Sequence, residues 1–144
     1  MEGFRHSTEL TARFNETDAQ GVIHHSVYIV WFEVARIAYL EGVESGYRGL
    51  IETGVDVTTV EAHTTYRAGV RFDDRLRIWT RSGDVRGARL RFDYVVERTS
   101  EPSGIVAEGW TGHACVDAKT LRPIRVPAEL AKRLAQLEGL TQSD

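Results

Sequence analysis

The sequence has few of the residues that cross-link or interrupt a chain: its 144 residues include one cysteine, Cys115, and three prolines. A single cysteine excludes an intrachain disulfide and leaves no cysteine-based zinc spacing. The N-terminus lacks the apolar core of a signal peptide. The best candidate for a membrane span, residues 29–40, is too short and carries Glu33 and Arg36. We therefore expect a cytoplasmic protein without membrane insertion.

The composition also lacks a strong excess of either charge. The net charge is −3 at pH 7, with 42% hydrophobic and 27% charged residues, which is typical of a globular protein. This balance gives no reason to expect nucleic acid or an anionic membrane as a partner. The length fits one domain over residues 1–144, for which we expect a core at 8–137 and a frayed tail at 138–144.

The N-terminal third combines one strand pattern with one long apolar helix. Residues 9–14 alternate, which predicts a strand with Leu10, Ala12 and Phe14 on one side. A helix is predicted to begin at His25 or Ser26 and to end near residue 42 or 46, before a turn at 46–54. A helix that is apolar nearly all round must be wrapped by the rest of the protein.

The remainder of the chain has the period of two that is typical of strands. We predict strands at residues 57–67, 75–83, 89–98 and 105–116, joined by short links. Such short links predict antiparallel hairpins between consecutive strands, because parallel neighbours need a long crossover. Residues 127–137 then form an amphipathic helix that begins at a proline.

These elements predict an α+β fold: a long central helix, a five-stranded antiparallel sheet and a short C-terminal helix. A single sheet covers only one side of the central helix. The other apolar side needs a partner, so we expect a homo-oligomer.

The junction between the first strand and the long helix carries the main chemical signal. Asp18 stands seven residues before His25, close to the predicted helix start, where backbone N–H groups lack intrahelical partners. Asp before a helix is usually a turn or N-cap residue. The helix begins beyond residues 21–23, however, so a capping role fits poorly. A catalytic carboxylate beside N–H donors for an oxyanion is the alternative, and we place the candidate active site at this junction.

The chain resembles the hotdog-fold acyl-CoA thioesterases, in the branch of 4-hydroxybenzoyl-CoA and Tol-Pal-associated thioesterases. The resemblance covers about residues 9–134. Its motifs in the first half of the chain are RFNETDAQGVI at 13–23, Tyr28 and WFEVAR at 31–36. The later motifs are YRA at 66–68, FDDRL at 72–76, an Arg-Pro pair at 122–123 and a Val-Pro pair at 126–127. The sequence departs from the usual family residues at His24, at Ser26 and Val27, and at Gly69.

The resemblance implies a helix wrapped by the sheet, and dimers or tetramers with active sites at subunit interfaces. It also implies hydrolysis of an acyl-CoA thioester to CoA and a carboxylic acid. Asp18 matches the catalytic carboxylate, which acts as nucleophile or general base in different members. His25 matches the position whose backbone N–H polarises the thioester carbonyl. Coenzyme A is then part of the substrate, and no separate cofactor is expected.

The same resemblance suggests residues that contact the substrate. We expect the substrate site to include Gly21, Val22, His24 and Tyr28, and Arg86 to hold CoA phosphates because arginine suits phosphate oxygens. Ordinary structural roles are the alternatives: a turn for the glycine, core packing for the tyrosine and a solvated charge for the arginine. A metal site is not expected, because adjacent histidines do not share a helix face.

Two other functions stay open from the sequence. Hydratases and dehydratases of the same fold pair an imidazole with a carboxylate, and Asp18 and His25 could supply such a pair. A non-catalytic module that binds acyl-CoA or another partner is the second alternative.

Overall fold

The computed structural model describes residues 1–42 and 52–140, so most of the turn predicted at 46–54 lies outside the described residues. The strands are β1 His6–Thr11, β2 Val55–Tyr66, β3 Arg75–Ser82, β4 Arg89–Arg98 and β5 Gly104–Asp117. The helices are a short 3-10 turn η1 at Phe14–Glu16, the long α1 at Val27–Leu40 and the C-terminal α3 at Ala128–Leu137. In the described residues, no helix is long and apolar enough to cross a membrane.

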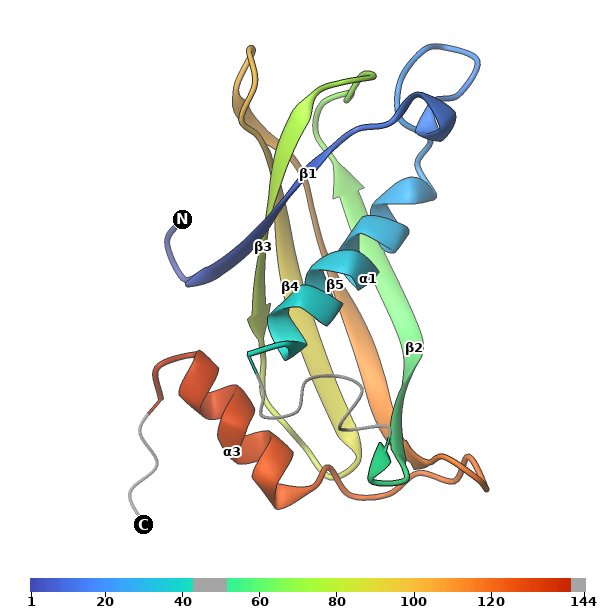
Figure 1. The fold of residues 1–144 in the computed structure, drawn as a ribbon, viewed down its shortest axis with the longest axis vertical. Helices are drawn as coiled ribbons and strands as arrows, with labels where there is room; N and C mark the ends of the chain where they lie inside the picture. The colour runs from blue at the N-terminus through green and yellow to red at the C-terminus, as the bar shows by residue number, and fades with distance from the viewer. Residues whose placement is uncertain (43–51, 141–144) are drawn as a thin grey trace.

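The five strands form one antiparallel sheet in the order β1-β3-β4-β5-β2. The predicted hairpins β3–β4 and β4–β5 are present. The hairpin predicted between β2 and β3 is wrong, because β2 pairs with β5 and β3 pairs with β1. The eight residues of the link, 67–74, cross the end of the sheet instead (Figure 1). An extended link of eight residues spans about 25 Å, which is enough to pass over β5 and β4.

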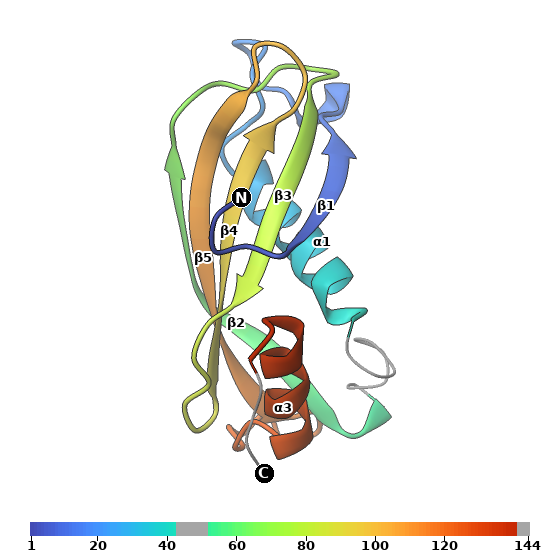
Figure 2. The same ribbon diagram turned by 90° about the vertical axis from the view of Figure 1, so that its left-hand side faces the viewer.

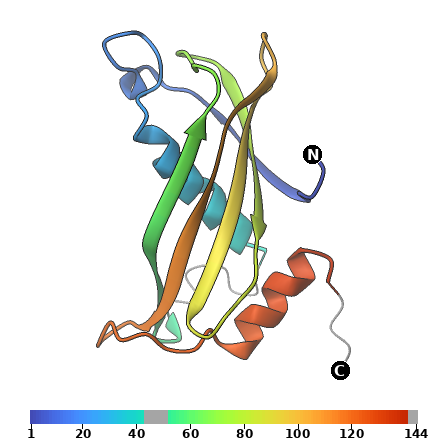
Figure 3. The ribbon, with the colours of Figure 1, turned by 180° about the vertical axis from the view of Figure 1, so that it is seen from behind.

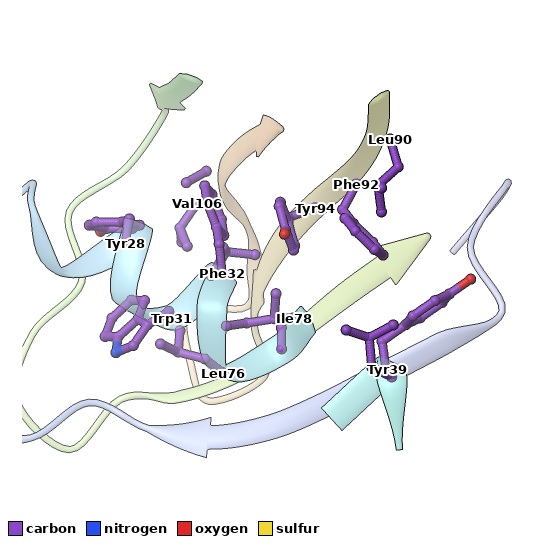
Figure 4. Close-up of a cluster of buried hydrophobic side chains, with 14 of the residues drawn as sticks. Tyr28, Trp31, Phe32, Tyr39, Leu76, Ile78, Leu90, Phe92, Tyr94 and Val106 are labelled. Carbon is purple, nitrogen blue, oxygen red and sulfur yellow. The ribbon is translucent and has the colours of Figure 1, made fainter. Parts of the chain in front are cut away.

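Helix α1 lies diagonally across one face of the sheet and forms the core with it (Figures 1 and 2). The ring of Phe32 stacks on that of Tyr94, with centroids 4.4 Å apart and planes 5° apart (Figure 4). Gly109 lies under this pair, where a Cβ would meet Phe32 Cε2 at 2.6 Å. A glycine on β5 therefore allows the helix to approach the sheet closely.

The opposite sides of both layers are open. No helix of the described residues covers the far face of the sheet (Figure 3). On α1, four aliphatic side chains that point away from the sheet are between 38% and 52% exposed: Ile29, Val30, Val34 and Ile37. The sheet thus wraps only one side of the helix, as the sequence predicts for a single chain.

Helix α3 is attached at the end of α1 that is remote from residue 18 (Figure 1). The Tyr39 hydroxyl donates to Glu138 Oε2 at 2.5 Å and lies 3.0 Å from Ser82 Oγ. His6 Nε2 donates to the Leu137 carbonyl at 2.6 Å. These bonds tie α3 to β1, α1 and β3.

The first strand differs from its prediction. It begins at His6 and ends at Thr11, so Phe14 leaves the strand for η1 and its side chain is 72% exposed. The expectation that Phe14 continues the strand on the same side as Leu10 and Ala12 is wrong, because β1 ends at Thr11 and Phe14 begins the 3-10 turn.

Candidate active site

Residues 16–24 form a small antiparallel hairpin at one end of the sheet (Figure 1). Thr17 bridges Ile23, the Asp18 N–H donates to the Val22 carbonyl at 2.8 Å, and the His24 N–H donates to the Glu16 carbonyl at 2.9 Å. Gly21 closes the turn with φ of +79°, a left-handed value that glycine adopts without steric cost. The hairpin places Asp18 and the start of α1 on one short piece of structure.

The Asp18 carboxylate is held by one of its oxygens only. Oδ1 accepts the N–H groups of Gln20 at 2.8 Å and Val22 at 3.4 Å. Among residues 1–42 and 52–140, Oδ2 has no hydrogen-bond or ion-pair partner. Asp18 is therefore a turn residue with one free oxygen; it is not a helix cap, because α1 begins at Val27 and its N-cap is Ser26.

The start of α1 has a fixed geometry. His24 Nδ1 accepts the Ser26 N–H at 3.1 Å and lies 2.7 Å from Ser26 Oγ, which places the proton of the neutral ring on Nε2. The His24 and His25 rings stack, with centroids 4.2 Å apart. The Tyr66 hydroxyl donates to the His25 carbonyl at 2.8 Å.

The His25 backbone also provides a free donor. In the described part of the chain, the His25 N–H has no acceptor, whereas both neighbouring N–H groups are bonded. A free backbone N–H at a helix start can bind an oxyanion.

A buried carboxylate that the sequence analysis missed anchors the hairpin to α1. Glu16 is 8% exposed; its Oε2 accepts the indole N–H of Trp31 at 3.0 Å and its Oε1 accepts the Arg13 N–H at 2.8 Å. The spacing of Arg13 and Glu16 is that of a capping box, in which residue N3 reaches back to the N-cap N–H. The sequence contains this spacing, so the structural role of Glu16 could have been predicted from it.

The link that follows β2 adds a third strand to the hairpin. The Ile23 N–H donates to the Val70 carbonyl at 2.7 Å, and Val22 bridges Arg71. Val22 thus lies between Asp18 on one side and Arg71 on the other, and it is half-buried. Sequence reasoning did not connect residues 70–71 with the Asp18 hairpin, because this contact spans about fifty residues.

Tyr28, in the first turn of α1, lies among the buried core side chains (Figure 4). Its side chain is 2% exposed and packs against Trp31 and Tyr66, with ring centroids 4.9 and 5.0 Å away. Burial raises the pKa of the Tyr28 hydroxyl to about 12, so the group stays protonated at neutral pH. A contact between Tyr28 and substrate stays a prediction.

Arg86 is not brought to the hairpin within one protomer. It lies in the β3–β4 loop, at the opposite end of β3 from the residue 71–74 turn (Figure 1). Eight residues of strand separate these ends by about 25 Å. A cavity of about 690 Å³ between that loop and α3 is likewise lined by residues remote from Asp18. In the described residues, no group of three His, Cys, Asp or Glu side chains suggests a metal site.

Comparisons with known proteins agree with this architecture. The family model of the thioesterase-like superfamily matches residues 12–134. The acyl-CoA thioesterase YbgC of Haemophilus influenzae is 28% identical over 118 residues, which cover 81% of this chain and 85% of the relative. A DHNA-CoA thioesterase structure from Staphylococcus aureus has a TM-score of 0.83 at 24% identity and covers 92% and 90% of the two chains. A hypothetical protein from Thermus thermophilus has a TM-score of 0.82 at 36% identity, with 91% and 98% covered.

These matches confirm the predicted α+β hotdog architecture and the resemblance stated from the motifs. The roles of the predicted site residues stay predictions: Asp18, Gly21, Val22, His24, His25, Tyr28 and Arg86.

Proposed function

Since the chain belongs to the thioesterase-like superfamily, we propose that it hydrolyses an acyl-CoA thioester at the Asp18 hairpin. The observation that carries the mechanism is a pair of groups without partners among the described residues: Asp18 Oδ2 on the hairpin and the His25 N–H directly after it. One can promote the attack on a carbonyl carbon, and the other can receive the charge that develops on its oxygen.

In the proposed reaction, Asp18 Oδ2 accepts a proton from a water molecule as that water attacks the thioester carbonyl carbon. The His25 N–H donates to the resulting oxyanion. Collapse of the tetrahedral intermediate breaks the C–S bond and releases CoA as a thiolate, a good leaving group that needs no strong acid. Direct attack by Oδ2, followed by hydrolysis of the anhydride, is the second route that the free oxygen permits.

Two substitutions test these roles. Asp18→Asn should lower kcat by about 10²–10⁴-fold, the usual contribution of a general base. His25→Ala keeps the backbone N–H, so its kcat should stay within a few-fold of wild type. Release of free thiol from a panel of aliphatic and aromatic acyl-CoAs measures both. Wild-type turnover by Asp18→Asn would contradict the mechanism; water addition to an enoyl-CoA without CoA release would indicate a hydratase.

The proposal includes a homodimer paired through β2. This strand is twelve residues long and bonded to β5 along one edge, while Val60 and Tyr66 on it are each 46% exposed. An open strand edge beside the exposed apolar side of α1 is a ready interface for a second copy. If two β2 strands pair antiparallel, the second copy points in the opposite direction along the sheet. It would bring Arg86 of the partner subunit toward the Asp18 end, where it could hold CoA phosphates.

The oligomeric state can be measured by light scattering on a size-exclusion column. We expect a mass of at least two chains for wild type. Val60→Asp places a charge at the β2 edge and should shift the protein toward monomer with loss of activity. A monomeric wild type with full thioesterase activity would overturn the interface but not the roles of Asp18 and His25.

A further inference from the structure

A cation that the proposed mechanism does not use, Arg71, lies over the tip of the Asp18 hairpin. The Arg71 guanidinium lies over Gly21, where a Cβ would be 3.7 Å from Arg71 Nη1. Among the described residues, this guanidinium has no hydrogen-bond or ion-pair partner. The nearby Asp74 carboxylate does not neutralise it, because Asp74 Oδ2 accepts the Arg71 backbone N–H at 2.9 Å and pairs with Arg98 at 3.5 Å.

Two exposed aromatic rings are in contact with each other, and one of them belongs to the residue that follows Arg71. Phe14 is 72% exposed and Phe72 is 56% exposed, and their rings meet edge to face with centroids 5.8 Å apart. Phe72 follows Arg71 directly, and the Phe14 carbonyl accepts the Thr17 N–H at 3.2 Å, one residue before Asp18. Two segments nearly sixty residues apart thus present a shared apolar surface, and one of these segments also carries Arg71.

The turn that presents Arg71 and Phe72 is held firmly. The Asp73 N–H donates to the Ala12 carbonyl and the Ala12 N–H donates to the Asp74 carbonyl, each at 2.9 Å. Asp73 has φ of +71°, a left-handed value that aspartate adopts more readily than most residues with a side chain, as is usual in turns.

From this arrangement we infer that Arg71, with Phe72 and Phe14, forms a substrate subsite for an anionic oxygen group. The inference rests on the proposed function, in which the reacting thioester lies at the same hairpin. Two parts of such a substrate could supply this chemistry: the diphosphate of CoA, or a carboxylate at the far end of the acyl group. A guanidinium binds either with charge-assisted hydrogen bonds, and the rings cover the apolar part next to it.

The test compares Arg71→Gln with wild type on three kinds of thioester. The first is an acyl-CoA with an uncharged acyl group, and the second carries the same acyl group on N-acetylcysteamine, which lacks the diphosphate. The third is an N-acetylcysteamine thioester of a dicarboxylic acid of matched length. We expect KM to rise about tenfold or more, with kcat nearly unchanged, for the substrates that carry the recognised anion.

A rise with the acyl-CoA alone identifies the diphosphate, and a rise with the dicarboxylic thioester identifies the acyl carboxylate. Arg71→Lys should restore part of the loss. Arg75→Gln is the matched control, because it removes an exposed charge four residues away, outside the hairpin, and should leave KM unchanged.

Equal KM values for Arg71→Gln and wild type on every substrate would overturn the inference, as would an equal rise on all three. If wild type hydrolyses none of them, the proposed function fails instead. Calorimetric titration of CoA and of the free dicarboxylic acid into the Asp18→Asn variant, with and without Arg71→Gln, then tests the subsite without turnover. Binding of neither anion, or binding unaffected by Arg71→Gln, would overturn the subsite.

Discussion

The indole N–H of Trp31 donates to the Glu16 carboxylate at 3.0 Å, and this buried bond joins helix α1 to the Asp18 hairpin. Both oxygens of Glu16 are in use, because the other accepts the Arg13 N–H at 2.8 Å. One acidic side chain therefore helps to fix the position of the proposed catalytic hairpin relative to the helix start, together with the backbone bonds of the hairpin.

Glu16→Gln should destabilise the protein and lower its activity. An amide has only one oxygen, so the variant can accept from Trp31 or from the Arg13 N–H but not from both. The lost bond should lower the free energy of unfolding by about 1–3 kcal/mol. Urea unfolding measures this loss, and thiol release measures the fall in kcat. Trp31→Phe removes the other partner of the bond and should also destabilise the protein, because it leaves Glu16 Oε2 buried without its donor and puts a smaller ring in the core. Unchanged stability and kcat in Glu16→Gln would contradict the anchoring role.

His113 should make the protein less stable in acid. Its ring is fully buried, its nitrogens lie 2.7 Å from Thr111 Oγ1 and 3.3 Å from Thr59 Oγ1, and burial lowers its pKa to about 3. The unfolded histidine titrates near its ordinary value of about 6.5, so between these values the unfolded state binds the extra proton. The contribution of the neutral ring to the free energy of unfolding is therefore fully present above about pH 6.5. It is lost as the pH falls toward 3, by up to about 1.4 kcal/mol per pH unit.

His113→Gln removes this titration and is its control. Urea unfolding of both proteins between about pH 7 and about pH 4 should show that the free energy of unfolding falls more steeply for wild type. The carboxylates contribute equally to both proteins, so the difference between the two pH profiles reports His113. Parallel pH profiles would show that His113 is not the group responsible.

Gly109→Ala should strongly destabilise the fold. Its Cβ would lie 2.4 Å from the His63 carbonyl oxygen and 2.6 Å from Phe32 Cε2, and neither the backbone of β2 nor the packed ring can move away cheaply. Overpacking of this kind costs about 3 kcal/mol. Gly83→Ala is the matched control on β3's end, where the nearest atom would be 3.7 Å away, so it should change stability by less than about 0.5 kcal/mol. Thermal unfolding distinguishes the two; equal effects would contradict the close approach of α1 to β5.

Tyr39→Phe should loosen α3 without affecting the hairpin. Burial, and then the hydrogen bond with Glu138, raise the pKa of the Tyr39 hydroxyl above its usual range, so it remains a donor to that carboxylate. Loss of this bond to a charged group should cost about 2 kcal/mol. Hydrogen exchange should increase in residues 128–137 more than at the start of α1. Uniform exchange changes across both helices would show that the contact does not act locally.

Local patterns predicted individual elements well. The strict alternation at residues 89–98 coincides with β4, and the predicted helix at 127–137 differs from α3 by one residue at its start. Asp18 and His25 were singled out by their spacing before a helix. Within the described residues, a carboxylate oxygen and an N–H without partners lie at these positions, and their roles stay predictions. Periodicity and capping depend on neighbours a few residues apart, so a single sequence contains them.

Long-range relations came only from the folded chain. The pairing of β2 with β5 left the predicted β2–β3 hairpin unformed and left β2 with an open edge. The pairing of β1 with β3 sets Arg86 at the end of the sheet opposite Asp18, and the link between β2 and β3 brings Arg71 over Gly21.

By itself, the sequence determined the types of the elements and the residues around which the site is built, because these follow from local chemistry. The tertiary structure decided which ends of those elements meet. That outcome depends on how the sheet closes around α1, on packing such as Phe32 against Gly109, and on buried bonds such as that between Trp31 and Glu16. These contacts join residues far apart in the chain, and their free energies are set only when all the partners are in place.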